Sequence, residues 1–312
     1  MMSELPTLAG LDGRGFGIND LGQVVGISNS GSGFQHGFLH ESGAITATDL
    51  GTALAGDKSS TANAINEWGQ IAAWSGPFNS VMDAKAYLYE SGVWTPLGTL
   101  GGTSSVSFGL DDAGRVVGWS DVAGDITFHA FLWADGQMTD LGTLGGPTSI
   151  AADVHDAGPM VGWSDMPNGS LTQHAFVYAG GEMADLNTLI PDGTGWELTF
   201  AVSVNAVGQI VGRGQIGGED HAYLATPATV KIDELADVVE SFALPRGIEN
   251  SLLVKLNTAR AALESCSPTT ACAPLGAFVK QVEAQSGKKL TTQQADSLLA
   301  AVAELRVALG CL

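Results

Sequence analysis

One pattern of about 45 residues recurs five times in this chain, and it restricts the fold more than any other feature. Each copy has a β-favouring run that ends in an Asn- or Asp-rich turn, a second run of the Val-Val-Gly type, and a third, aromatic run. A fourth run reads Leu-Gly-Thr-Leu or a close variant. The turn glycine recurs at intervals of 47, 45, 44 and 50 residues, at Gly22, Gly69, Gly114, Gly158 and Gly208.

Four short strands in about 45 residues match one blade of a β-propeller, which is a four-stranded antiparallel sheet. The fifth copy stops after its third run and lacks the fourth, whereas the chain begins with a copy of that fourth run at Leu5–Gly10. An N-terminal strand there would complete the last blade, close the ring and leave no sheet edge open. The sequence therefore predicts an all-β five-bladed propeller over residues 1–228.

The third run opens with a related triplet in every copy. The triplets begin at His36, Lys85, His129, His174 and His221, and most read His-Ala-Phe or His-Ala-Tyr. Together with the turn and Leu-Gly-Thr-Leu runs, they resemble the HAF repeat of bacterial extracellular proteins over residues 4–226. The resemblance implies export and a repeat architecture, and it implies little about chemistry. Because one active site does not need five copies of a residue, we expect these histidines to be structural.

The pattern changes to helical spacing after Pro227, which predicts a separate domain over residues 229–312. Helices are expected from Asp233, from Pro245 and from Ala273, and a capping box at Thr291–Gln294 begins the last one. These helices predict a small antiparallel bundle. Around Leu275–Gln294 the domain resembles the FIMAH-type helical modules of secreted bacterial proteins, which implies an accessory role in attachment.

All three cysteines, Cys266, Cys272 and Cys311, lie in this helical domain. They predict one disulfide, either between Cys266 and Cys272 or from Cys311 to one of these two. A zinc site is less favoured, because the domain has no histidine and offers only three thiolates. A catalytic cysteine is also disfavoured, since its histidine would have to come from the propeller.

The charge distribution restricts the partners of the chain. Its formal charge is −20, with 5 basic against 24 acidic residues in residues 1–228 and 8 against 9 in the remainder. An acidic surface argues against nucleic acid, whose phosphates require basic residues. No apolar run reaches the ~20 residues that span a membrane, and residues 1–11 carry no signal-peptide pattern. We expect a secreted, periplasmic or cell-surface protein and, given a closed ring, a monomer.

Polar side chains follow the first run of every copy, where the inner strands of a propeller converge on its axis. They are Asn19, Asn66, Asp111, His155 and Asn205. Amide and carboxylate oxygens suit Ca²⁺, which takes 6–8 oxygen ligands, so Asn19, Asn66, Asp111 and Asn205 are candidate calcium ligands. His155 is a candidate general base, with Asp156 beside it. The alternative is that these residues form the Asx-turns that hairpins favour.

Such a ring is similar in plan to the site of calcium-dependent propeller lactonases, although those enzymes usually have six blades. This similarity implies a calcium-assisted hydrolase of a small lactone or ester at the channel mouth. The alternative is a non-catalytic module that binds carbohydrate or a surface. It draws on the loops at the opposite mouth, where Trp119-Ser-Asp121 and Trp163-Ser-Asp165 place an aromatic ring beside a carboxylate. Asp83 and Asp125 lie in the same set of loops.

Overall fold

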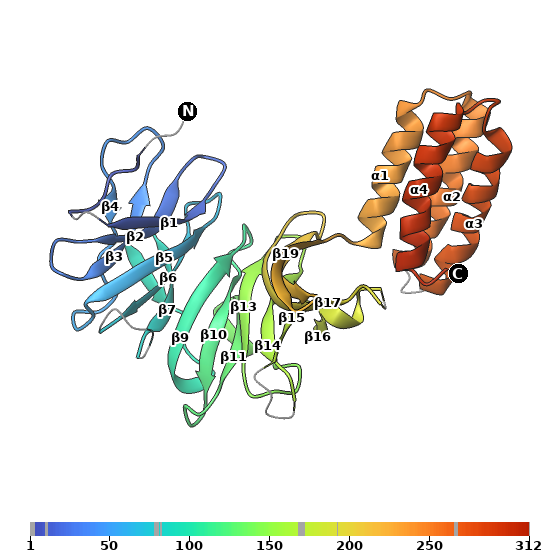
Figure 1. Cartoon of the computed structure of the whole chain (residues 1–312). Helices are drawn as coiled ribbons and strands as arrows, with labels where there is room; N and C mark the ends of the chain where they lie inside the picture. Colours follow the sequence, from blue (N-terminus) through green and yellow to red (C-terminus); the bar gives the residue numbers. More distant parts are fainter. Residues whose placement is uncertain are drawn as a thin grey trace. The chain divides into compact units, whose positions relative to one another are not determined.

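The computed structural model describes residues 4–9, 12–77, 81, 83–167, 172–191, 193–264 and 268–311. Within these ranges the chain forms antiparallel β-sheets followed by four helices (Figure 1). It divides into two compact units. The first comprises Met1–Asn187, Trp196–Ala206 and Ile210–Tyr223, and the second comprises Thr188–Gly195, Val207–Gln209 and Leu224–Leu312.

Five sheets follow one another along the chain, one for each copy of the repeat. The first consists of β1 (Gly13–Ile18), β2 (Val24–Asn29), β3 (Gln35–His40) and β4 (Thr48–Asp49). The second consists of β5 (Ser59–Ile65), β6 (Ile71–Gly76), β7 (Lys85–Glu90) and β8 (Val93–Pro96). The third consists of β9 (Gly101–Leu110), β10 (Val116–Val122), β11 (Phe128–Ala134) and β12 (Gln137–Asp140).

The fourth sheet consists of β13 (Ser149–Val154), β14 (Met160–Asp165), β15 (Gln173–Ala179) and β16 (Glu182–Asp185). A short 3₁₀ helix, Leu186–Thr188, follows it. The fifth sheet has three strands, β17 (Trp196–Val204), β18 (Ile210–Ile216) and β19 (Glu219–Ala225). In every sheet the strands are ordered as they occur in the chain, so each sheet is an antiparallel meander. The four-run repeat thus predicts the strands of these sheets correctly.

The glycine of the Val-Val-Gly run lies in the second strand of a sheet, opposite a β-bulge in the first strand. The register of β9 and β10 shifts between Val117 and Gly118, and a Cβ on Gly118 would lie 1.9 Å from the carbonyl oxygen of Val106. A side chain there would collide with main chain that has no freedom to move. In the fourth sheet a Cβ on Gly162 would lie at the same distance from the carbonyl oxygen of Ile150. Glycine thus allows the close approach of the two strands in these sheets, whereas Ala73 stands at the same position beside the register shift of the second sheet.

The apolar core of the first unit lies between consecutive sheets. β5 packs against β2 and β3, β9 against β6 and β7, β13 against β10 and β11, and β17 against β14 and β15. One buried cluster, for example, joins Ala86 and Leu97 of the second sheet to Leu110 and Phe131 of the third. This face-to-face stacking of meander sheets makes the fold propeller-like.

The two ends of the sheet series differ from the prediction of a closed ring. Leu8 N–H donates to Ser28 Oγ at 3.1 Å and Ala9 N–H donates to the Asn29 carbonyl at 3.2 Å, so residues 4–9 lie against the first sheet. The fifth sheet keeps three strands, with β19 at its edge. The described residues of Leu5–Gly10 form no strand beside β19, so the predicted closure of the ring is not seen among the described residues, and Gly10 lies outside them.

The second unit holds the predicted helical domain. Its helices are α1 (Ala228–Ser241), α2 (Arg246–Glu264), α3 (Pro268–Gln285) and α4 (Thr292–Ala308). Their buried faces form one core that includes Leu252, Leu256, Phe278 and Leu298. The capping box is confirmed, because Thr291 Oγ accepts from Gln294 N–H and the Gln294 side chain accepts from Thr291 N–H.

Two of the three cysteines are joined by the disulfide Cys272–Cys311, which links α3 to the end of the chain. Of the predicted pairings, the structure therefore contains one from Cys311, and Cys266 lies outside the described residues. The first helix begins at Ala228, five residues before the predicted start, because Pro227 can precede a helix directly. None of the described helices is long and apolar enough to span a membrane.

Candidate functional site

The predicted ring residues lie at equivalent turns of consecutive sheets, where they link one sheet to the next. Asn19 Nδ2–H donates to the Asn66 carbonyl at 3.0 Å, and Asn66 Nδ2–H donates to the Asp111 carbonyl at 3.0 Å. Their side-chain oxygens accept from main-chain N–H groups of their own turns, such as Gln23 N–H to Asn19 Oδ1 at 3.0 Å. Asn19, Asn66 and Asp111 are all buried.

In the third sheet the charged pair of Asp111 and Arg115 replaces the amide. Asp111 pairs with Arg115, whose Nε–H donates to Asp111 Oδ2 at 2.6 Å, and Arg115 Nη2–H donates onward to the His155 carbonyl at 2.9 Å. His155 Nδ1 accepts from Ala157 N–H at 3.2 Å. Asn205 occupies the equivalent turn after β17 and is exposed. Asn-to-carbonyl contacts and this arginine thus do the same work in successive sheets.

A second ladder runs beside the first, one residue further along each turn. Asp20 N–H donates to Glu67 Oε1 at 2.7 Å, and Glu67 N–H donates to Asp112 Oδ1 at 2.9 Å. Asp112 N–H then donates to Asp156 Oδ1 at 2.7 Å. The predicted catalytic residue Asp156 is therefore an exposed member of a sheet-to-sheet hydrogen-bond series.

These contacts decide what the ring can offer a cation. The oxygens of Asn19, Asn66 and Asp111 hold the main-chain N–H groups of their Asx-turns, which is the alternative that the sequence left open. In the described part of the chain, no group of three or more His, Cys, Asp and Glu side chains could hold a metal ion. The contacts give the calcium site no support, and it stays a prediction.

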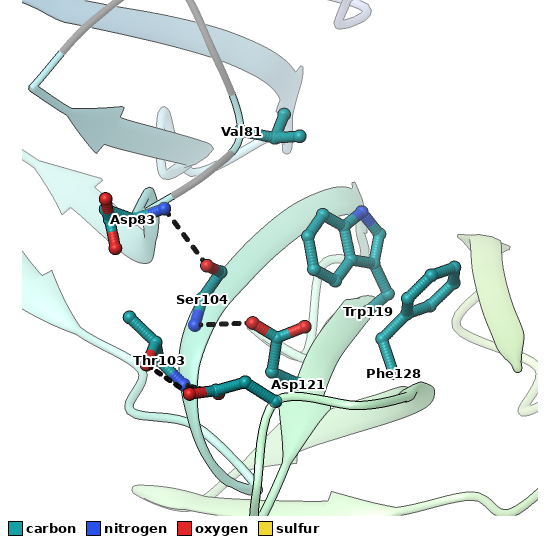
Figure 2. A pocket seen from close by; sticks show the side chains of 8 residues that line it. Val81, Asp83, Thr103, Ser104, Trp119, Asp121 and Phe128 are labelled. Atoms are coloured by element: carbon teal, nitrogen blue, oxygen red, sulfur yellow. Dashed lines mark hydrogen bonds between the residues drawn. The ribbon is translucent and has the colours of Figure 1, made fainter.

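A cavity of about 330 Å³ lies at the opposite end of the strands, between the second and third sheets. Figure 2 shows Trp119 and Asp121 of β10, Phe128 of β11, and Ser104 of β9 around it. The full lining is Val81, Asp83, Thr103, Ser104, Trp119, Asp121, Asp125 and Phe128. This set contains Trp119, Asp83, Asp121 and Asp125, which the sequence places in the variable loops. It also contains residues that the sequence analysis did not select, namely Val81, Thr103, Ser104 and Phe128.

Two aromatic rings form one wall of the cavity. The centroids of Trp119 and Phe128 are 5.1 Å apart, with their planes tilted by 52°. Trp119 is only half-buried. Contact with Phe128 restricts its rotation, so the indole is a rigid surface with an accessible part, as ligand stacking requires.

Three carboxylates line the cavity, and two of them are held in place. Asp121 Oδ2 accepts from Ser104 N–H at 3.0 Å. Asp125 accepts from Thr103 N–H at 2.5 Å and from Thr103 Oγ1–H at 2.7 Å. These hydrogen bonds, with a smaller contribution from the charge of Lys85, lower the pKa of Asp125 below its usual value. The carboxylate of Asp125 is thus ionised at neutral pH.

Asp83 is positioned by its backbone. Its N–H donates to Ser104 Oγ at 3.1 Å, and its φ of 64° lies in the left-handed region that a non-glycine residue adopts only at some cost. Figure 2 shows this contact across the cavity from the indole of Trp119. The loop before β7 is therefore tied to the third sheet by Ser104.

The cavity coincides with a departure from the repeat. In three sheets the triplet histidine is hydrogen-bonded to the last residue of the fourth strand, which is an Asp. The pairs are His36 with Asp49, His129 with Asp140 and His174 with Asp185, at 2.6–3.0 Å. This confirms the predicted structural role of these histidines. In the second sheet Lys85 and Pro96 stand at the two positions, so the pair is lost. The resulting ammonium group contributes to the electrostatics of the cavity through Asp125.

The second copy of the Trp-Ser-Asp motif has different surroundings. The ring of Trp163 packs against Phe200 of β17 at a centroid distance of 5.1 Å, and Arg213 lies over the same Phe200 ring at 4.5 Å. Asp165 accepts a hydrogen bond from Thr148 Oγ1–H. The two copies of the motif are therefore not equivalent binding positions.

Asp153 is a further candidate that the sequence analysis missed. It lies two residues before His155, where the other copies have Gly17, Ala64, Gly109 and Ser203. Asp153 Oδ2 accepts from Ser203 Oγ–H at 2.7 Å and from Val204 N–H at 3.0 Å, which joins the fourth sheet to the fifth. Burial raises the pKa of Asp153 above its usual value, against these hydrogen bonds. The signal that could have identified it is a charge at a position otherwise occupied by small residues.

No protein-family model matches the chain, and no curated protein matches it. Among solved structures, it is similar to one assigned as TolB from Agrobacterium tumefaciens, with 13% sequence identity and a TM-score of 0.47. That similarity covers 70% of this chain and 76% of the other.

Proposed function

We propose that this protein is a non-catalytic carbohydrate-binding protein whose site is the cavity between the second and third sheets. The observation that carries the proposal is the half-buried indole of Trp119, fixed against Phe128 at 5.1 Å, facing a cavity with three carboxylates. An aromatic plane beside hydrogen-bond acceptors suits the two faces of a sugar ring, of which one is apolar and the other carries hydroxyl groups.

The size and polarity of the cavity fit this ligand class. Its volume of about 330 Å³ is near the lower end of small-molecule pockets, roughly 300–1,000 Å³. One sugar ring of a longer chain is therefore the expected occupant. Its C–H face would stack on Trp119, and its hydroxyl groups would donate to Asp121 and Asp83.

A lactone or ester hydrolase with calcium and His155 stays a prediction from the sequence. The binding function is favoured because the side chains of the ring already have structural partners, whereas the cavity has an accessible aromatic surface. Asp121 also keeps one carboxylate oxygen for which no protein donor is found among the described residues.

We further propose that the five sheets are five blades of a propeller-like protein that acts outside the cytoplasm. The disulfide Cys272–Cys311 supports export, because such bonds persist in oxidising compartments. In this proposal the HAF-like repeats present the binding cavity, and the FIMAH-like helices serve attachment.

The test is a titration of the full chain with a panel of oligosaccharides, followed by calorimetry. We expect millimolar to micromolar binding of at least one member, and a loss of at least tenfold in affinity for Trp119→Ala. Trp163→Ala is the matched control, because Trp163 occupies the same repeat position in the next sheet and packs instead against Phe200 of β17. Equal binding by Trp119→Ala and the native chain would contradict the proposed site. Hydrolysis of a lactone or an ester that stops when a chelator is added would instead support the hydrolase prediction.

A further inference from the structure

Each internal boundary between sheets buries the same repeat positions, and the two ends of the series leave those positions exposed. The last residue of the first strand is Ile65, Leu110 or Val154 in the second to fourth sheets, where it is 4–9% exposed. In the first sheet the corresponding Ile18 is 69% exposed. The second, third and fourth sheets each bury this face against the preceding sheet. The first sheet has no preceding sheet, so the same face is exposed there.

The fifth sheet presents the complementary face. The second residue of the Val-Val-Gly run is fully buried in the first four sheets, as Val25, Ala72, Val117 and Val161. The corresponding Val211 of β18 is 44% exposed. Ala222 of β19 is likewise exposed, whereas its counterparts Ala86, Ala130 and Ala175 are fully buried.

One further exposed apolar side chain enlarges the end face. Val202 is exposed, and its counterpart Asn63 reaches the following sheet, where its Nδ2–H donates to the Ser107 carbonyl, so Val202 lies on the same side as Val211. Exposed apolar surface of this kind marks an interaction site. Four boundaries inside the chain already pair these two kinds of face with each other. The exposed face of the first sheet is therefore complementary to the exposed face of the fifth.

The hydrogen bonds at the sheet edges indicate the same complementarity. In the internal boundaries the first leucine of the fourth run bonds to the strand before it: Leu97 N–H donates to the Ala86 carbonyl and Leu141 N–H to the Ala130 carbonyl, at 2.9–3.0 Å. The last leucine of the same run bonds to the next sheet, as Leu100 N–H does to Ser120 Oγ at 2.9 Å.

The N-terminal copy of this run makes the second kind of contact within its own chain, through Leu8 and Ser28. Leu5 takes the position of Leu97 and Leu141 in this copy. The carbonyl that Leu5 N–H would reach belongs to Ala222, the counterpart of Ala86 and Ala130. β19, which carries Ala222, is the edge strand of a three-stranded sheet.

We propose that the fifth sheet binds the first sheet of a second copy of this chain, head to tail. Residues 4–9 of the second copy then form the fourth strand beside β19, and Ile18 of that copy packs against Val211. A second copy is the occupant because the extensive contacts among described residues join only consecutive sheets, and none joins β17–β19 to β1–β4 of the same chain. The interface is heterologous, so it generates a ring or an open filament of copies.

The first measurement is sedimentation velocity of the full chain over a hundredfold range of concentration. The proposal requires that larger species grow with concentration. Ile18→Asp and Val211→Asp should each weaken association at least tenfold. Ile45→Asp and Val254→Asp are matched controls, because both side chains are exposed and belong to other elements, the loop between β3 and β4 and the helix α2. Circular dichroism verifies that each variant is folded.

Mixing the two variants gives the decisive result. Ile18→Asp keeps an intact fifth sheet and Val211→Asp keeps an intact first sheet, so an equimolar mixture should form a 1:1 heterodimer and nothing larger. A self-complementary interface would give no such recovery. A native chain that is monomeric at every concentration, or an end-face variant that associates like its control, would overturn the proposal. A monomer in which residues 4–9 protect β19 of the same chain from hydrogen exchange would identify ring closure instead.

Discussion

Asn66 Nδ2–H donates to the main-chain carbonyl of Asp111 at 3.0 Å, although the two residues are 45 positions apart in the sequence. The Oδ1 atom of the same side chain accepts from Trp68 N–H and Gln70 N–H. One buried amide therefore closes its own turn and also holds the next sheet in place. Asn19 repeats this arrangement toward Asn66. The alignment of the turns along the series thus depends on a few amide groups.

Removal of the Asn66 amide should weaken the boundary between the second and third sheets. Asn66→Ala leaves Gln70 N–H without its acceptor and removes one of the two donors to the Asp111 carbonyl, which still accepts from Gly114 N–H. This should lower the free energy of unfolding by about 1–3 kcal/mol. Asn66→Asp keeps the acceptor but turns a buried carboxylate oxygen toward the Asp111 carbonyl and Gln70 Oε1, so a loss at least as large is expected. Urea unfolding measures both.

The same experiment separates the turn from a calcium site. Chelator should leave the unfolding curve of the native chain unchanged if Asn66 serves only the turns. A chelator effect as large as that of Asn66→Ala would instead show that a cation binds there.

Asp153 should make stability depend on pH. Burial raises the pKa of Asp153 in the folded chain above its unfolded value, so the folded state binds more protons in the interval between the two values. Stability therefore falls as pH rises from the ordinary aspartate pKa, about 4, through the raised value. Asp153→Asn cannot ionise and should gain stability relative to the native chain as pH rises from about 3.5 to 7. Parallel pH curves for the two proteins would contradict the raised pKa.

Gly118→Ala should disrupt the bulge between β9 and β10. The added Cβ would meet the Val106 carbonyl oxygen at 1.9 Å, so the main chain must shift, at a cost of about 1–3 kcal/mol or more. Gly56→Ala is the matched control, because a Cβ at Gly56 meets no atom within 4 Å. Thermal unfolding of both variants tests this, and equal melting temperatures would show that the sheet tolerates the change.

Reduction of the Cys272–Cys311 disulfide should destabilise the helices selectively. A bond that closes a sequence separation of 39 contributes roughly 2–4 kcal/mol, and all three cysteines lie in the helical domain. Reductant should therefore lower the helical melting transition followed by circular dichroism at 222 nm. The sheets provide an internal control, because they contain no cysteine, and their tryptophan fluorescence transition should stay in place.

The repeat predicts the strands well because each sheet is a local meander with its own turn glycine and its own Val-Val-Gly run. Closure could not be predicted in the same way. Leu5–Gly10 has the sequence of a fourth strand, but pairing with β19 depends on the summed geometry of all five sheets. The roles of Asn19, Asn66 and Asp111 were ambiguous for another reason. An amide that bridges two sheets and an amide that binds a cation look alike in sequence.

The cavity between the second and third sheets was only partly visible in the sequence. Asp83, Asp121 and Asp125 are visible because they lie in the loops that vary most between copies, and Trp119 is visible because it places an aromatic ring beside Asp121. Phe128 was not, because it precedes a triplet histidine and reads as an ordinary strand residue. The clearest signal was the joint change of the His–Asp pair to Lys85 and Pro96, which requires comparison of two runs eleven residues apart in one copy.

Among the described residues, each sheet packs extensively only against its neighbours in the series, which gives this protein the energetics of a chain of linked units. Its stability is then a sum of unit terms and boundary terms, so the outermost sheets should exchange their amide hydrogens first and the third sheet last. Gain or loss of a whole repeat changes the number of boundaries without altering any one of them. Proteins built on this plan can therefore vary in length over evolution by duplication alone, while substitutions at a single boundary, such as the one beside Lys85, change that boundary and leave the others intact.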